Sequence, residues 1–174
     1  MILDGLLLFT AVPGTGDLPT TGTQNSTNVL DLGITGLPVS GSGGGARDIG
    51  IGDDPAMKLL VQVMTAFTGG TSLAVALQGA PDNGSGAPGT YTTMLTGAAV
   101  VEASLIVGAR ILDDDMPRPI PGQAIPRFLR LNYITVGTHT AGAVIGTLVL
   151  DRMDQPLQAN AVMGGYPPGI VIAN

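Results

Sequence analysis

Apolar and polar residues alternate in two stretches near the middle of the chain, residues 58–67 and 71–78. The alternating apolar positions are Leu59, Val61, Val63, Phe67, Leu73, Val75 and Leu77. A period of two is typical of strands that bury one face. The Thr-Gly-Gly-Thr sequence that joins the two stretches predicts a hairpin turn. We therefore expect Leu73, Val75 and Leu77 to lie in the core between two sheets.

Shorter apolar and β-branched runs predict further strands. These runs are residues 2–10 (a strand or an apolar arm), 28–33, 90–95, 98–112 (one or two strands) and 127–151 (a second hairpin). Segments rich in glycine, proline or threonine predict loops at residues 11–27, 34–55, 79–89 and 113–126. We predict the last of these loops because its prolines lack the backbone N–H donor that a sheet ladder needs.

Together these elements predict an all-β fold without helices. Many short strands separated by turns favour a jelly-roll-type β-sandwich of about eight strands, with long loops and extended termini. No change in composition marks a second domain. We expect one domain over residues 1–174, made of a loop-rich N-terminal part (1–57), core strands (58–151) and a C-terminal tail (152–174).

Composition separates this chain from disordered and membrane proteins. Hydrophobic residues make up 44% and charged residues 11%, whereas soluble proteins typically carry about 25% charged residues. Disorder needs low hydrophobicity and high charge, and the apolar runs are far shorter than the roughly 20 residues of a spanning helix. The opening residues include Asp4 and no basic region. We therefore expect no membrane partner and no signal peptide, with synthesis in a cytoplasm.

The few cations and few aromatic residues argue against nucleic-acid and carbohydrate partners. The net charge is −6, and the seven Lys and Arg residues form no cluster, so we expect no nucleic-acid binding. Cysteine is absent, so the chain has neither disulfides nor thiolate metal sites. With no Trp, three Tyr and three Phe, it has few rings on which a sugar or base could stack.

His139 is the single histidine and lies in the sequence Gly-Thr-His-Thr-Ala-Gly. A catalytic triad needs a nucleophile and an orienting acid around such a residue, and the chain lacks the G-x-S-x-G motif. One histidine is also too few for the metal site of a cupin-like enzyme. We interpret His139 as a turn residue and expect no catalytic residues. A small hydrolase centred on His139 is the weaker alternative.

Three adjacent acids, Asp113, Asp114 and Asp115, offer oxygen ligands for Ca²⁺. They lack the spaced pattern of a calcium loop, so we expect solvated carboxylates; a structural cation near them is left open. The glycine-rich residues 40–50 lack the phosphate-loop pattern as well. We expect no metal and no cofactor.

Arg127 and Arg130 flank apolar positions of one predicted strand. They either pair with acids of a neighbouring subunit or keep an outer face soluble, and the sequence leaves both interpretations open.

Three blocks of the sequence resemble the cement (decoration) proteins of tailed bacteriophages, the family typified by the Bordetella phage cement protein. The blocks are residues 1–9 with 26–33, residues 46–52 with 59–94, and residues 127–151. The resemblance implies a jelly-roll protein on the outside of an icosahedral head that bridges major capsid subunits and has no catalytic residues. It also favours an architectural role for the segment around His139.

From this resemblance we expect a protein made in the cytoplasm of the bacterial host and placed on the outer surface of the virion. The expected partners are the major capsid protein and the protein itself, as a homodimer or, as the alternative, a trimer. We predict that the apolar chain ends contact partners, since isolated apolar runs need cover; a tail folded on its own sandwich is the competing interpretation. The predicted interface residues are Leu6, Leu7, Leu8, Tyr166, Ile170, Val171 and Ile172. The rival function is a receptor- or glycan-binding module.

Overall fold

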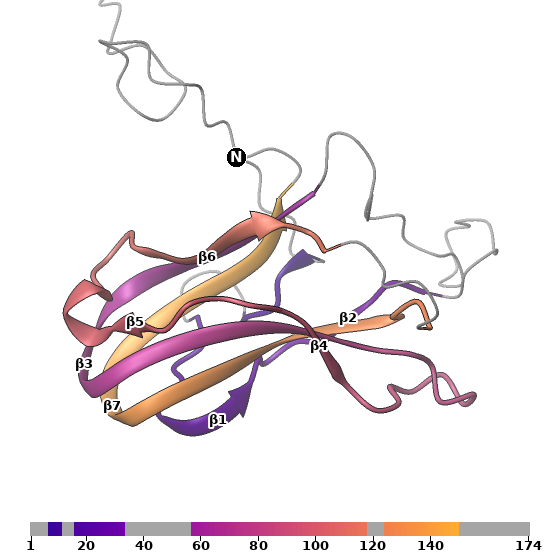
Figure 1. Ribbon diagram of the computed structural model, residues 1–174, viewed down its shortest axis with the longest axis horizontal. Coiled ribbons are helices and arrows are strands. Elements are labelled where there is room, and N and C mark those ends of the chain that lie inside the picture. Colours follow the sequence, from indigo (N-terminus) through magenta and orange to yellow (C-terminus); the bar gives the residue numbers. More distant parts are fainter. Residues whose placement is uncertain (1–6, 12–15, 34–56, 118–123, 150–174) are drawn as a thin grey trace, which may run out of the picture.

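The protein is an antiparallel all-β sandwich in a computed structural model. The structure describes residues 7–11, 16–33, 57–117 and 124–149. The strands are β1 (Thr21–Asn25), β2 (Leu30–Asp31), β3 (Lys58–Ala80), β4 (Thr92–Thr96), β5 (Val100–Val101), β6 (Arg110–Asp115) and β7 (Phe128–Val149), with a 3-10 turn, η2 (Glu102–Ser104), after β5. No α-helix occurs in these ranges. The prediction of an all-β sandwich is confirmed (Figure 1).

Two long strands form the spine of the fold. β3 and β7 pair antiparallel from Lys58 opposite Val149 to Ala80 opposite Phe128. The two hairpins predicted at residues 68–71 and within 127–151 are therefore wrong, because each stretch is one continuous strand. Both strands bend at the same place, where the register shifts several times between Val63 and Ser72 (Figure 1).

Glycines explain why the strands bend there without reversing. Gly69 has φ +87° and Gly137 has φ +80°, a left-handed conformation that other residues rarely adopt. Gly70 pairs with Gly137 across the bend. Two adjacent glycines in a sequence predict a hairpin. Here a glycine of β3 lies opposite a glycine of β7, so the two paired strands bend together and neither reverses.

The bend divides the single sheet into two layers. One layer pairs the first half of β3 with β6 and the end of β7. The other pairs the second half of β3 with β4, β5 and the start of β7, along which β1 and β2 lie. A Cβ on Gly146 would lie 2.4 Å from Cδ1 of Leu131. The two halves of β7 thus face each other across the core.

The core between the layers contains the alternating positions of the sequence. Leu73, Val75 and Leu77 are each 0% exposed, which confirms their predicted burial. Other fully or almost fully buried apolar side chains are Phe9, Leu59, Val61, Val63, Leu105, Leu129, Leu131, Tyr133, Val144 and Leu148. Residue Phe9 brings the N-terminal segment into this core as well.

Three local predictions differ from the structure or are refined by it. Residues 21–25 form β1 and not a loop, because their backbone pairs with β7 from Thr21 to Asn25. The three acids at 113–115 end β6 and are not part of a loop, since β3 supplies their ladder partners. Segment 98–112 is two strands joined by the turn η2, which is one of the predicted alternatives.

Candidate functional site

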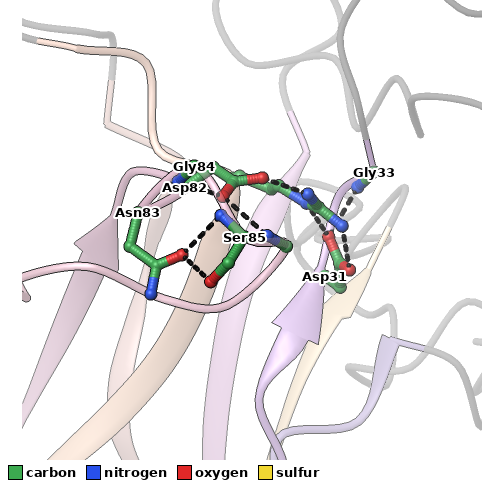
Figure 2. A network of polar contacts seen from close by, with 8 residues as sticks. Asp31, Gly33, Asp82, Asn83, Gly84 and Ser85 are labelled. Atoms are coloured by element: carbon green, nitrogen blue, oxygen red, sulfur yellow. Dashed lines mark hydrogen bonds and ion pairs between the residues drawn. The ribbon is translucent and has the colours of Figure 1, made fainter.

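Arg127 joins three segments that are distant in sequence. Its Nε and Nη2 donate hydrogen bonds to Oδ1 and Oδ2 of Asp31 at 2.8 and 2.9 Å, and its Nη1 donates to Oδ2 of Asp82. The guanidinium also lies 4.8 Å from the ring centroid of Phe128. A planar guanidinium suits such two-point contacts with carboxylates. The network fastens β2 and the 81–89 turn to the start of β7 (Figure 2).

The 81–89 turn is itself held by side chains that accept backbone hydrogen bonds. Oδ1 of Asp82 accepts from the N–H groups of Gly84 and Gly86 at 2.7 and 3.0 Å, and Oδ1 of Asn83 accepts from the N–H of Ser85 at 2.9 Å (Figure 2). These backbone hydrogen bonds, followed by Arg127, hold the pKa of Asp82 below its usual value. Asp82 is therefore charged over the physiological pH range.

We predict that Asp82→Asn lowers the melting temperature at pH 7, and that the difference from the parent protein disappears in acid. A carboxyl group whose pKa is lowered by folding stabilises the protein above its unfolded pKa of about 3.9. That stabilisation is lost as the pH falls through the folded pKa. Thermal melts between pH 7 and pH 2.5 measure both effects.

The control is Asp114→Asn, because Asp114 is exposed and accepts a hydrogen bond from the backbone N–H of Asp115. An asparagine oxygen can accept the same bond, and Asp114, unlike Asp82, pairs with no cation among the described residues, so we expect little change. A constant difference between Asp82→Asn and the parent at every pH would contradict the role given to this carboxylate.

A second network anchors the N-terminal segment. The carboxylate of Asp17, a residue only 7% exposed, accepts hydrogen bonds from Oγ1 and N of Thr27 at 2.6 and 3.0 Å, and from the hydroxyl of Tyr133 at 2.9 Å. The N–H of Ala11 donates to the same carboxylate. Burial, and then the charge of Asp17, raises the pKa of Tyr133. This buried carboxylate is well satisfied, so it fixes the segment to β7.

His139 lies at the bend of β7 and not in a turn, which corrects the predicted position. It is 1% exposed. The centroid of its ring lies 5.0 Å from the ring centroid of Phe67, in an edge-on arrangement. The ring also occupies the space that a Cβ on Gly70 would need. Nε2 is 3.4 Å from the carbonyl oxygen of Ser72, and Nδ1 has no hydrogen-bond partner in the described segments. A substrate could reach this ring only by displacing the residues that enclose it.

Two of the three acids of β6, Asp113 and Asp115, pair with cations of their own chain. Oδ2 of Asp113 accepts a hydrogen bond from Arg110 at 3.0 Å, and Asp115 pairs with Lys58. No group of three or more His, Asp or Glu residues that could hold a metal ion occurs in the described part of the chain. The geometry there is that of surface ion pairs, whose individual contributions to stability are small.

The two arginines of the predicted strand also find partners within the chain. Arg127 forms the network described above. Arg130 lies 3.7 Å from the ring centroid of Tyr91, and its Nε donates to Gln78 at 2.9 Å. These contacts favour the intramolecular use of both side chains.

A model of one protein family matches residues 18–148, from just before β1 almost to the end of β7. The chain belongs to the Bbp16 family. Bbp16 is a family of Bordetella phage proteins, which confirms the resemblance noted from the sequence blocks. Membership in the Bbp16 family identifies a phage structural protein. No curated protein matches the chain. Within the described ranges, no helix is long and apolar enough to cross a bilayer.

The predicted partner contacts of this Bbp16 protein fall mostly outside the described residues. Those outside are Leu6, Tyr166, Ile170, Val171 and Ile172. Leu7 is half-buried and packs against the core, while Leu8 is 2% exposed and forms a β-bridge with Thr147. The Leu8 side chain is thus covered by its own sandwich. The interface assignment of the other residues stays a prediction.

Proposed function

We propose that this Bbp16 protein is a cement protein that binds the outer surface of the phage head and staples neighbouring major capsid subunits. The family match carries the proposal. The proposal places the protein on the virion after synthesis in the host cytoplasm and gives it no catalytic role. The continuous pairing of β3 with β7 and the networks around Asp17 and Arg127 support it, because a clip must resist deformation when the shell is under load.

Stapling follows from two general effects. A subunit with two attachment points needs only modest affinity at each, since binding at the first raises the effective concentration at the second. A protein that binds the assembled shell, and not the separate subunits, stabilises the shell by mass action. Packaged DNA pushes the subunits apart, and the clip must lose contacts before they separate.

We propose a homodimer as the working unit, with a trimer as the alternative. The sheet edges support self-association: β1 (Thr21–Asn25) and β4 (Thr92–Thr96) carry no charged side chain, whereas the β6 edge is strongly charged. Charged residues are the usual protection of an edge strand against pairing. A reconstruction of the head that shows isolated monomers, each on one capsid subunit, would contradict this arrangement.

The function is tested on heads that lack the protein. Purified protein should sediment with such heads and raise the temperature at which they release DNA. On native virions, a 17.5 kDa band should be present in a fixed ratio to the major capsid protein. Absence of the band from virions, or a failure to bind heads, would reject the proposal.

We predict that removing residues 164–174 leaves the sandwich folded but weakens its association with partners, so that heads become fragile to heat. The removed segment contains the apolar Ile170-Val171-Ile172 run, and an apolar strand added to a neighbour's sheet edge binds through main-chain hydrogen bonds. Circular dichroism and co-sedimentation with heads measure the two effects. If the truncated monomer unfolds, the tail belongs to its own core and the arm hypothesis is wrong.

A further inference from the structure

The end of β5 and its connection to β6 present apolar side chains to solvent. Val101 is 57% exposed, Ile106 61% and Val107 66%. The connection includes the short coiled ribbon between β5 and β6, beside the bend of the two long strands (Figure 1). With Glu102, these residues make up what we call the β5–β6 tip. Ile106 and Val107 are adjacent in the chain, and exposed apolar side chains that gather in one place can mark an interaction site.

The tip is held in place although its side chains are exposed. Leu105, at its centre, is 0% exposed and anchors it to the core. The N–H of Phe67 donates to the carbonyl of Leu105 at 3.0 Å, and the N–H of Gly108 donates to the carbonyl of Val63 at 2.9 Å. A preformed loop loses little conformational entropy on binding. The tip therefore has the physical character of a binding element.

The tip carries one charge. Glu102 is the single ionisable residue between 100 and 109, and it forms no ion pair with any described residue. The surface to which the tip is complementary is thus an apolar socket with a Lys or Arg at its rim. A symmetric contact with a second copy would bring two Glu102 carboxylates close together, and like charges oppose such an interface.

We propose that the β5–β6 tip inserts into an apolar socket with a basic rim on the major capsid protein. Ile106 and Val107 fill the socket, and Glu102 pairs with the cation of the rim. This inference rests on the proposed function and adds to it the surface that contacts the shell.

The test compares two valine-to-aspartate variants in co-sedimentation with heads that lack the protein. Val107→Asp places a charge in the socket and should weaken binding by at least about tenfold, as expected for a central contact residue. Val29→Asp is the matched control, because Val29 is 45% exposed and lies outside the tip; its binding should stay close to that of the parent. Val107→Ser repeats the test without a charge should the aspartate variant fold poorly.

Glu102→Gln tests the rim separately. Binding of the parent protein should weaken with added salt, and the variant should bind less tightly and with a shallower salt dependence, because an ion pair at a rim is screened. An unchanged salt dependence would reject the basic rim.

The remaining outcomes separate the inference from the function on which it rests. If the parent protein does not bind heads, the proposed function fails. If the parent binds and Val107→Asp and Val107→Ser bind equally well, or if Val29→Asp loses as much, the function stands and the tip is not the contact. If Val107→Asp changes the mass of the free protein in light scattering, the tip contacts a second copy and the inference is wrong.

Discussion

Replacing Val75 by aspartate is expected to prevent folding. Val75 is 0% exposed and lies in β3 opposite Tyr133 of β7. A carboxylate at this position would be buried without a cation or hydrogen-bond donors, and an isolated buried charge is very costly. A domain of this size has a total stability of only about 5–15 kcal/mol, so one such group is enough to unfold it. Circular dichroism and the soluble yield after expression measure the result.

The matched control is Val136→Asp. Val136 lies in β7, in the same layer of the sandwich, but is 55% exposed. The same substitution there should leave the protein folded, with a melting temperature near that of the parent. A soluble Val75→Asp protein with an unchanged melting temperature would show that this face of β3 does not form the core.

Replacing Gly70 by alanine is the second change for which we expect a large effect. A Cβ at this position would lie 2.1 Å from Cε1 and 2.2 Å from Nδ1 of His139. The ring is buried and packs against Phe67, so it has little room to retreat. Overpacking of this kind costs about 1–3 kcal/mol and sometimes more. We expect the melting temperature to fall by roughly 5–10 °C, since about 2–4 °C corresponds to 1 kcal/mol in proteins of this length.

A double-mutant cycle identifies the cause. His139→Ala removes the ring and leaves a cavity, so it destabilises the protein alone. In that background Gly70→Ala should cost little, because the added methyl group no longer meets the imidazole. The coupling between the two sites should then be large. If the two effects simply add, the clash with the imidazole is not the cause of the destabilisation.

The core could be predicted from sequence, and the path of the strands could not. Alternation placed Leu73, Val75 and Leu77 correctly, since period two depends on burial of one face alone. The hairpins failed because a glycine pair allows both a reversal and a bend. Which of these occurs depends on the pairing of β3 with β7, and that pairing joins residues far apart in the chain.

The polar networks cannot be predicted from the sequence for the same reason. Asp17 lies in a segment that looks like a loop, and its partner Tyr133 lies in another part of the chain. Arg127 stands out in the sequence, but its partners Asp31 and Asp82 come from two other segments. The burial of Leu8 is not predictable either. In the sequence it looks like part of an exposed apolar arm, but in the structure its own chain covers it. Local pattern carries no information about such neighbours.

The shared bend has a consequence for how the protein folds. Because β3 and β7 each run through both layers, two continuous backbones join the layers, and side chains of both layers pack into one core. The pairing of Lys58 with Val149 closes most of the described chain into one loop. Folds dominated by such non-local pairs have a high contact order and fold slowly. We therefore expect the sandwich to fold slowly and as one unit.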